Sequence, residues 1–223
     1  MGTFFRSTLV AFGLLMAGMA VALATEQSQV VKLTEVPVAA QKTILAEAGR
    51  AKGELGDIEK TSDDDETWYD VELTTGKRTR SFSVAPDGKL LTWQVFMNEI
   101  PVPARQAIHA QVQAAKGKLG DIDRVVEDGV VTFEVAMNKD GKEISFTISR
   151  DGKLLSLQVE LTETPDAVQK TIRAQTVGGE IKKIEKNIDD EDGEITYGVE
   201  MKKAGKKISF SVDANGKLVE PEN

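Results

Sequence analysis

The sequence predicts an α+β protein made of three tandem repeats, each with one helix packed on a four-stranded antiparallel sheet. Three observations predict this class. Residue patterns recur at one constant step over most of the chain. Within each copy, apolar residues change from a spacing near four, typical of a helix, to a spacing of two, typical of a strand. Short Asp-Gly and Asn-Gly segments, which favour tight hairpins, separate the strand-like segments.

Apolar positions show the repeat most clearly. The distance in sequence from Ile44 to Ile108 is also the distance from Ile108 to Ile172, and we call it the repeat step. The same step relates Val71, Val135 and Val199, and also Phe82, Phe146 and Phe210. The segment Asp-Gly-Lys-Leu at residues 87–90 recurs at 151–154, and again as Asn-Gly-Lys-Leu at 215–218. Copies of this size bury little core alone. No Pro/Gly/Ser-rich linker separates them, so we expect the copies to touch and hold a fixed relative orientation.

A proline opens each predicted helix, because its missing N–H is not needed in the first turn. The three prolines are Pro37, Pro101 and Pro165. In the first copy Ala40, Ile44 and Ala48 are spaced by four and share one helix face. Gly49 is expected to help end this helix.

The second copy shows the strand pattern best. Residues 131–137, 144–148 and 155–159 alternate apolar with other side chains, and a weaker strand at 122–127 precedes them. One repeat is therefore a helix followed by a four-stranded meander. The helix should cover the apolar face of the sheet, and the other face should be polar and open. The predicted repeats 1, 2 and 3 span residues 32–96, 97–160 and 161–223.

Residues 1–24 are predicted to be a secretory signal peptide. Arg6 is their one basic residue, and the apolar stretch from Thr8 to Ala24 ends in the small-x-small pattern that signal peptidases accept. The alternative is an uncleaved membrane anchor, although this stretch is slightly shorter than the roughly 20 apolar residues that a spanning helix needs. The sequence thus predicts a periplasmic or secreted chain, with no stable membrane insertion after cleavage.

The composition argues against several classes of function. The chain has no cysteine, hence no disulfide, thiolate nucleophile or cysteine-ligated metal. One histidine, His109, leaves little room for a Ser-His-Asp triad. A net charge of -8 argues against nucleic acid as a partner. We therefore expect no catalytic residues, no metal site and no cofactor, and an unrecognised hydrolase is the least favoured alternative.

A polar sheet face repeated three times predicts a platform for a protein partner. If the apolar neighbours of Trp68 face the helix, Trp68 faces outward with Asp70 and Glu72. An exposed tryptophan is a frequent binding anchor. The alternative is that Trp68 packs against a neighbouring copy. The predicted partner-binding residues are Trp68, Asp70, Glu72, Glu134 and Glu200.

Two predicted hairpin tips, residues 63–66 and 189–193, are acidic. Calcium takes carboxylate oxygens as ligands, but the spacing of an EF-hand loop is absent and no helices flank these segments. A solvated turn is the preferred interpretation. Calcium binding stays open as the alternative.

A family resemblance rests on motifs spread along each copy. In repeat 1 these are Val36-Pro37, Gln41 to Ile44, Gly56 to Ile58, Tyr69 to Glu72, Ser81 to Val84 and Asp87 to Leu91. The pattern resembles the PepSY-like repeat, most closely its β-lactamase-inhibitor-like subgroup, over nearly all of the chain after the predicted signal peptide. The resemblance implies an exported inhibitor or propeptide-like module that binds a protein. Known tandem β-lactamase inhibitors carry disulfides, which this chain lacks.

Together these features predict an exported, non-catalytic protein-binding module. Its sharpest form is an inhibitor or modulator of an extracytoplasmic hydrolase of the peptidase or β-lactamase type. The alternative is a cell-envelope sensor that binds a small ligand or calcium. The identity of the partner protein stays open.

Overall fold

The computed structural model describes residues 27–63 and 66–219, so the predicted signal peptide lies outside the described residues. Within them, one sheet of 13 strands follows the chain order from β1 to β13. Every neighbouring pair of strands is antiparallel. Helices occur after β1, β5 and β9. The predicted α+β class, with a helix followed by four strands in each of three copies, is confirmed.

The elements repeat with the predicted period. The α-helices are α1 (Val38–Ala51), α2 (Val102–Ala114) and α3 (Asp166–Gln175), each preceded by a 3-10 turn, η1 (Leu33–Glu35), η2 (Met97–Glu99) or η3 (Leu161–Glu163). The strands of the first copy and its leading edge are β1 (Gln27–Val31), β2 (Glu54–Asp63), β3 (Glu66–Thr75), β4 (Arg78–Val84) and β5 (Leu90–Gln94). The later strands are β6 (Lys118–Glu127), β7 (Val130–Lys139), β8 (Lys142–Ser149), β9 (Leu154–Gln158), β10 (Glu180–Ile188), β11 (Ile195–Lys203), β12 (Lys206–Asp213) and β13 (Leu218–Val219).

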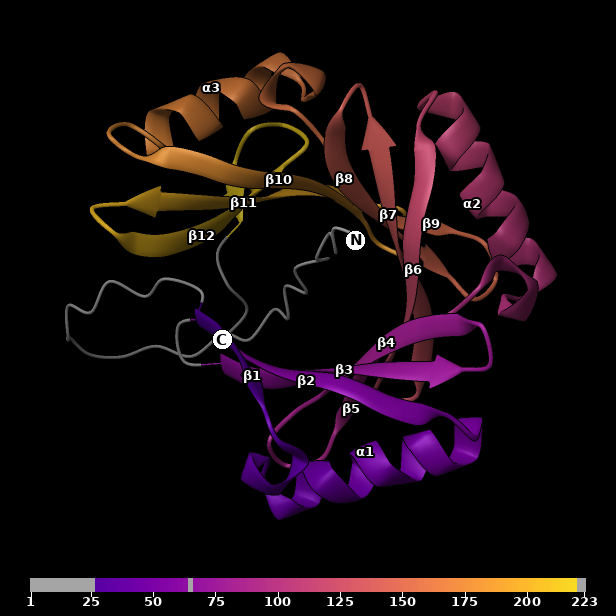
Figure 1. Cartoon of the computed structure of the whole chain (residues 1–223). Helices are drawn as coiled ribbons and strands as arrows, with labels where there is room; N and C mark the ends of the chain where they lie inside the picture. The colour runs from indigo at the N-terminus through magenta and orange to yellow at the C-terminus, as the bar shows by residue number, and fades with distance from the viewer. Residues whose placement is uncertain (1–26, 64–65, 220–223) are drawn as a thin grey trace.

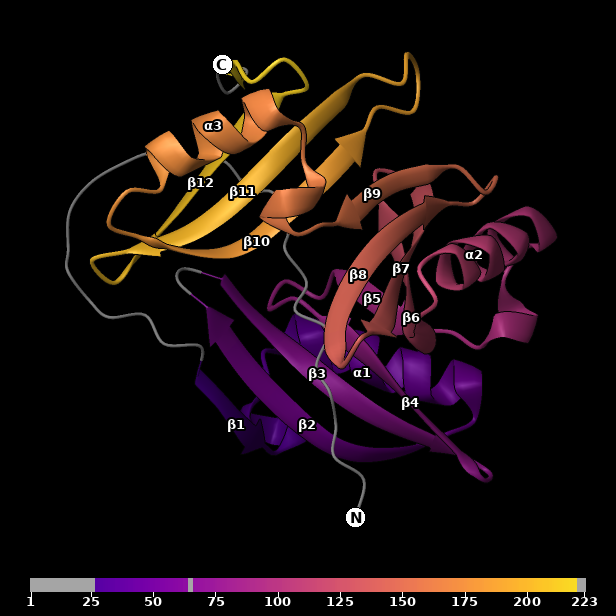
Figure 2. The same cartoon turned by 90° about the horizontal axis from the view of Figure 1, so that it is seen from above.

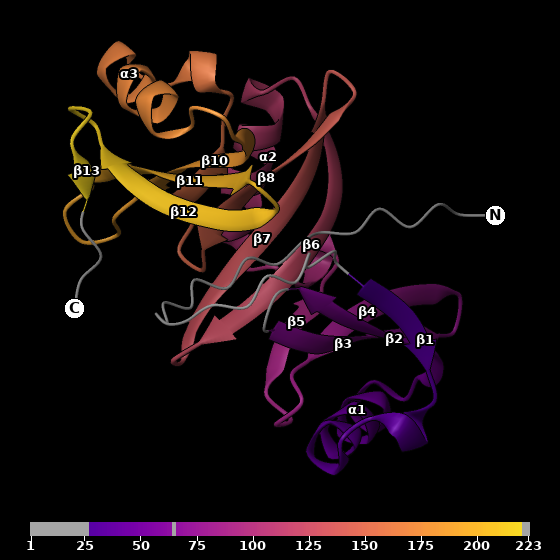
Figure 3. The same ribbon diagram turned by 90° about the vertical axis from the view of Figure 1, so that its left-hand side faces the viewer.

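The sheet curls, and the helices lie on its outer side. Figure 1 shows α1, α2 and α3 at the periphery and the strands toward the centre of the molecule. Figure 3 shows α1 and α3 toward opposite ends of the molecule, and Figure 2 shows the fold from above, with α2 and α3 at its edge. The sheet faces without helices therefore all belong to the inside of one curve.

Each helix covers its own hydrophobic core. Ile44, Ile108 and Ile172 are all 0% exposed, one in each of three separate clusters of buried residues. The equivalence of these positions, predicted from the repeat step, is confirmed. In each cluster, apolar helix residues spaced by four pack against apolar strand residues spaced by two, because each element has one apolar side to bury.

Helix ends differ in part from expectation. Pro37, Pro101 and Pro165 open the helices as the sequence predicts, but as N-cap residues one place before the first helical turn. Gly49 does not end α1: the helix continues to Ala51, and Lys52 adopts the left-handed conformation at φ 52°. Helix α3 has 10 residues against 14 and 13 in α1 and α2. The stretch from Ile172 to Ile184 is also two residues shorter than the matching stretch from Ile108 to Ile122, so the third copy loses part of its helix.

Strand pairs join the repeats. β5 pairs with β6 through Thr92 and Val125, and β9 pairs with β10 through Leu157 and Lys186. Backbone hydrogen bonds thus give neighbouring repeats the fixed orientation that the missing linkers predict. Strand β1 pairs with β2 and lies before residue 32, where the first repeat was expected to begin. β1 pairs with the first strand after α1, just as β5 pairs with the first strand after α2 and β9 with the first strand after α3.

Each corner between a strand and the following helix is closed in the same way. The carboxylates of Glu35, Glu99 and Glu163 accept hydrogen bonds from the backbone N–H groups three residues earlier, at 2.7, 2.8 and 2.8 Å. This arrangement satisfies a backbone donor before the 3-10 turn, as a capping-box glutamate does. It recurs at the repeat step and helps each helix return to its own part of the sheet.

Candidate functional site on the inner face

The sheet face opposite the helices carries the predicted site. Along β3, side chains alternate between the core and this face, with Tyr69, Val71 and Leu73 buried. Their neighbours therefore point away from α1. We call this side of the sheet the inner face. Its charged residues include Glu59, Asp70, Glu72, Asp123, Glu134, Lys183, Glu185 and Glu200.

Asp70 is the centre of a hydrogen-bond network in repeat 1. Its Oδ2 accepts a hydrogen bond from Trp68 Nε1 at 2.9 Å and from Thr61 Oγ1 at 3.2 Å. Its Oδ1 accepts from Ser83 Oγ at 2.5 Å, and Ser83 Oγ in turn accepts from Thr92 Oγ1 at 3.1 Å. The network crosses four strands and fixes the indole of Trp68 on the inner face. Trp68 is half-buried, held by a charge-assisted hydrogen bond.

The second repeat places two carboxylates opposite each other. Asp123 on β6 is the cross-strand partner of Glu134 on β7. Burial, together with the negative charges of Glu134, Asp121 and Asp70, raises the pKa of Asp123 from 3.8 to about 7. Burial also raises the pKa of Glu134, an effect that Lys183 opposes and Glu185 reinforces. Carboxylates withdrawn from water bind protons more tightly because the charged form loses hydration.

The third repeat carries a cation on the same face. Lys183 Nζ lies 3.3 Å from Glu185 Oε2. Ser156 of the preceding repeat donates a hydrogen bond to Glu185 Oε1 at 3.0 Å. Glu185 pairs across the strands with Gly198, at the place where the earlier copies have Asp70 and Glu134. The cross-strand carboxylate pairs of the first two copies are Glu59 with Asp70 and Asp123 with Glu134. In the third copy Glu185 faces a glycine instead, and its ion pair is with Lys183 on its own strand.

Glu72 and Glu200 complete the inner face along their strands. Both are half-buried. Glu200 Oε2 lies 4.0 Å from Lys207 Nζ. Glu72 lies over β2, where a Cβ atom built on Gly56 would stand 3.1 Å from the Glu72 Cβ. The small residue lets the Glu72 side chain lie flat on the neighbouring strand.

All the predicted partner-binding residues lie on one face of the sheet: Trp68, Asp70, Glu72, Glu134 and Glu200. The charge of Asp70 in repeat 1 raises the pKa of Asp123 in repeat 2, and the charges of Lys183 and Glu185 in repeat 3 act on the pKa of Glu134. The face is therefore continuous across the repeats. The sequence prediction missed Asp123, Lys183 and Glu185. Extending the alternation through residues 122–127 would have placed Asp123 on this face. That the five predicted residues bind a partner stays a prediction.

The acidic tip after β10 contains an aspartate that stabilises the turn itself. Asp189 Oδ1 accepts hydrogen bonds from the backbone N–H groups of Glu191 at 2.8 Å and Asp192 at 3.1 Å. These bonds lower the pKa of Asp189. The other tip, residues 63–66, lies partly outside the described residues. Across 27–63 and 66–219, no group of three or more acidic or histidine side chains is arranged to hold a metal ion.

The membrane alternative concerns residues that precede β1. Among the helices of the described ranges, none combines the length and apolar character that crossing a bilayer requires. The predicted anchor or signal peptide, residues 1–24, is outside those ranges.

The fold defines this chain as an α+β tandem-repeat protein built on one antiparallel sheet. A solved structure from Bacteroides vulgatus is similar to it, of a protein described as periplasmic and of unknown function. The two are 16% identical with a TM-score of 0.37, and the match covers 59% of this chain and 99% of the other. No family model matches the chain, and no curated protein matches it.

Proposed function

We propose that this chain is an exported, non-catalytic module that binds another protein through the inner face. One observation carries the proposal. The helix-free sides of three repeats are joined by strand pairing into one curved surface, which presents half-buried polar and charged side chains. A helix already covers the opposite side of every repeat. The inner face is therefore a large structured surface that no described helix covers.

The charges on this face favour a basic partner surface. Asp123 and Glu134 are withdrawn from water and lie close to further carboxylates. A lysine or arginine brought against them would restore the interactions that the carboxylates lose on leaving water, through charge-assisted hydrogen bonds. Complementary charge of this kind guides encounter and specificity. Trp68 supplies an aromatic contact at the repeat 1 end of the face.

The partner that we propose is an extracytoplasmic hydrolase of the peptidase or β-lactamase type. The resemblance of the repeat motifs to the PepSY-like, β-lactamase-inhibitor-like repeat supports this choice, and the predicted signal peptide supports a periplasmic or secreted location. The chain would then act as an inhibitor or modulator, holding the hydrolase without taking part in chemistry.

Affinity capture from the exported protein fraction of the source organism tests the proposal. The inner-face variant combines Asp70→Asn, Glu134→Gln and Glu200→Gln. A matched variant removes the same number of carboxylates elsewhere, through Asp128→Asn, Asp140→Asn and Asp166→Asn, all exposed positions. Both variants are checked for folding by thermal unfolding before use.

The proposal predicts that the unaltered chain and the matched variant retain the same hydrolase and that the inner-face variant loses it. Raising the salt concentration should also release the partner, because charge attraction is screened. The hydrolase activity of the captured partner is then measured with and without the chain. Equal capture by the two variants would show that the inner face is not the binding surface.

The alternative, a sensor for a small ligand, is favoured by a separate feature. A cavity lies on the helix side of the sheet beside Trp93. It shares none of its lining residues with the inner face.

A further inference from the structure

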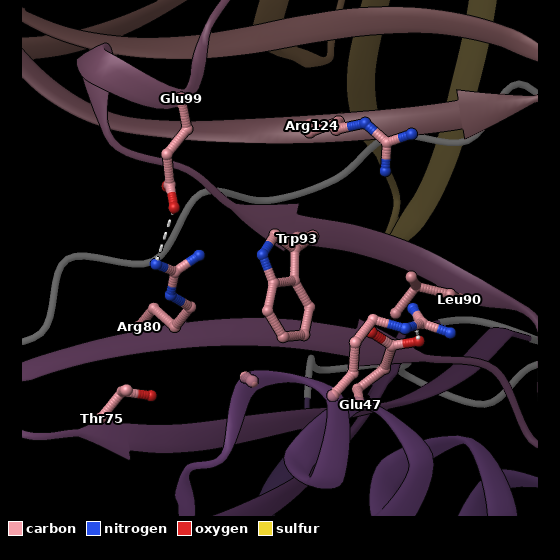
Figure 4. Close-up of a pocket in the computed structure, with 9 residues that line it drawn as sticks. Glu47, Thr75, Arg80, Leu90, Trp93, Glu99 and Arg124 are labelled. Atoms are coloured by element: carbon pink, nitrogen blue, oxygen red, sulfur yellow. Dashed lines mark hydrogen bonds and ion pairs between the residues drawn. The ribbon is translucent and has the colours of Figure 1, made fainter.

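The cavity lies where repeat 1 meets repeat 2, on the side of the sheet that faces the helices (Figure 4). Its volume is about 430 Å³, within the range of small-molecule sites, roughly 300–1,000 Å³. Helix α1, strands β3, β4, β5 and β6, and the turn η2 all contribute to it. The lining residues are Glu47, Arg50, Ala51, Thr75, Arg80, Leu90, Trp93, Glu99 and Arg124.

Trp93 forms the aromatic wall of this cavity. Its ring is tilted by 31° to that of Phe82, with centroids 5.0 Å apart. Trp93 also packs against the hydrophobic clusters of both repeat 1 and repeat 2. The Arg80 guanidinium lies over this ring, 5.6 Å from its centroid. The indole is therefore held between two cores, and the part that Arg80 leaves uncovered lies beside Leu90 and Ala51 as a rigid apolar surface.

Among the described residues, one cation that lines the cavity has no side-chain partner. Arg50 pairs with Glu47 at 2.5 Å and Arg80 pairs with Glu99 at 3.1 Å. The Arg124 side chain makes no hydrogen bond or ion pair with any residue that the structure describes. Figure 4 shows its guanidinium beyond the edge of the Trp93 ring, on the opposite side from Arg80.

The fold does not require most of these residues. One repeat later, the positions of Arg80 and Trp93 are held by Ile144 and Leu157, which pack against the repeat 2 core. The position of Arg124 is held by Lys186, paired with Leu157. The second junction of the same sheet therefore keeps a cation at this place but has aliphatic side chains instead of Arg80 and Trp93. Arg80, Trp93 and the Glu47–Arg50 pair thus give the first junction a polar cavity that joining the repeats does not need. Glu99, by contrast, recurs as Glu163 in the corner that every repeat keeps.

We propose that this cavity binds a small monocarboxylate with an apolar body, the carboxylate pairing with Arg124 and the apolar body lying on Trp93 and Leu90. A ligand with a single negative charge would neutralise Arg124, the one arginine of the lining that pairs with no described carboxylate. The planar guanidinium suits a carboxylate, with which it forms two parallel hydrogen bonds. The apolar part of the ligand would gain by leaving water against the indole. This site is independent of partner binding at the inner face.

The test uses phenylacetate and hexanoate as probes, with neutral 2-phenylethanol as the uncharged match of phenylacetate. NMR titration of the full chain follows the Trp93 indole N–H signal, which is assigned as the one that remains in a Trp68→Phe variant. Isothermal titration supplies the affinities. Arg124→Gln removes the unpaired charge, and Lys186→Gln is the matched substitution at the equivalent position of the second junction.

The proposal predicts saturable binding of phenylacetate that shifts the Trp93 signal. Removing a charged hydrogen-bond partner should weaken binding at least about tenfold in Arg124→Gln, while Lys186→Gln stays within about twofold. Arg124→Lys keeps the charge without the planar fork and should lie between them. The proposal is overturned if neither carboxylate binds in the millimolar range, if 2-phenylethanol binds as tightly as phenylacetate, or if Arg124→Gln binds as the unaltered chain does.

Discussion

Asp123 of β6 faces Glu134 of β7 across the inner face, and burial with neighbouring negative charge raises the pKa of Asp123 to about 7. In the unfolded chain this carboxyl has its ordinary pKa of 3.8. The folded chain therefore binds more protons than the unfolded chain between these values. The free energy of unfolding must fall as the pH rises through this window.

We expect Asp123→Asn to remove this pH dependence. The unaltered chain should lose up to about 3 kcal/mol of unfolding free energy between pH 5 and pH 8, for a shift of this size. Because the substituted amide stays neutral, this loss should largely disappear in the variant. Urea unfolding at several pH values measures it. Asp128→Asn, at an exposed hairpin tip, should keep the slope of the unaltered chain. Parallel curves for Asp123→Asn and the unaltered chain would contradict the assignment.

The network around Asp70 should stabilise repeat 1. Asp70→Ala leaves the donors of Trp68, Thr61 and Ser83 without this acceptor, at an expected cost of about 1–3 kcal/mol. Chemical denaturation gives the free energy, and Trp68 fluorescence should change as its N–H is released. Glu72→Ala, on the same strand and face, serves as the control, with an expected change within about 0.5 kcal/mol. Equal effects of the two substitutions would argue against the network.

The three equivalent isoleucines should respond alike to truncation. Ile44→Ala, Ile108→Ala and Ile172→Ala each open a cavity in a fully buried core, which costs about 2–5 kcal/mol. Leu45→Ala, next to the first of them but 53% exposed, should cost about 0.5 kcal/mol or less. Equilibrium unfolding in denaturant checks both values. A negligible loss at one isoleucine would show that its repeat does not share the packing of the others.

Gly152 lies in a tight turn directly beneath the start of α2. Its φ is 89°, and a Cβ atom there would stand 2.8 Å from the backbone oxygen of Pro103. Gly129 has a similar φ of 82° but no atom within 4 Å of such a Cβ. Gly129→Ala should therefore cost about 1–2 kcal/mol, from backbone strain alone.

Gly152→Ala adds a clash with the helix to the same strain, so it should destabilise the chain by more than Gly129→Ala. Thermal unfolding of the two variants side by side measures the difference. A melting temperature for Gly152→Ala at or above that of Gly129→Ala would mean that the turn can move away from α2 without loss.

Local patterns were enough to predict the repeat, the helix stripe through Ile44 and the hairpin strands. Each depends on residues close in sequence, whose spacing matches the period of a helix or a strand. The outward position of Asp70 followed from the same alternation. Strand β1 was missed because its few residues carry no such alternation, and its place in the sheet depends on pairing with β2.

Only the tertiary structure decided how the three units combine. Any two exposed strand edges offer the same backbone donors and acceptors. Side-chain patterns therefore did not predict that β5 pairs with β6, or β9 with β10. That pairing brings Asp123 within electrostatic reach of Asp70 and sets Arg124 beside Trp93. The sequence by itself determined the unit and its two-sided sheet. The continuous inner face and the cavity arise from contacts between repeats, which local periodicity does not encode.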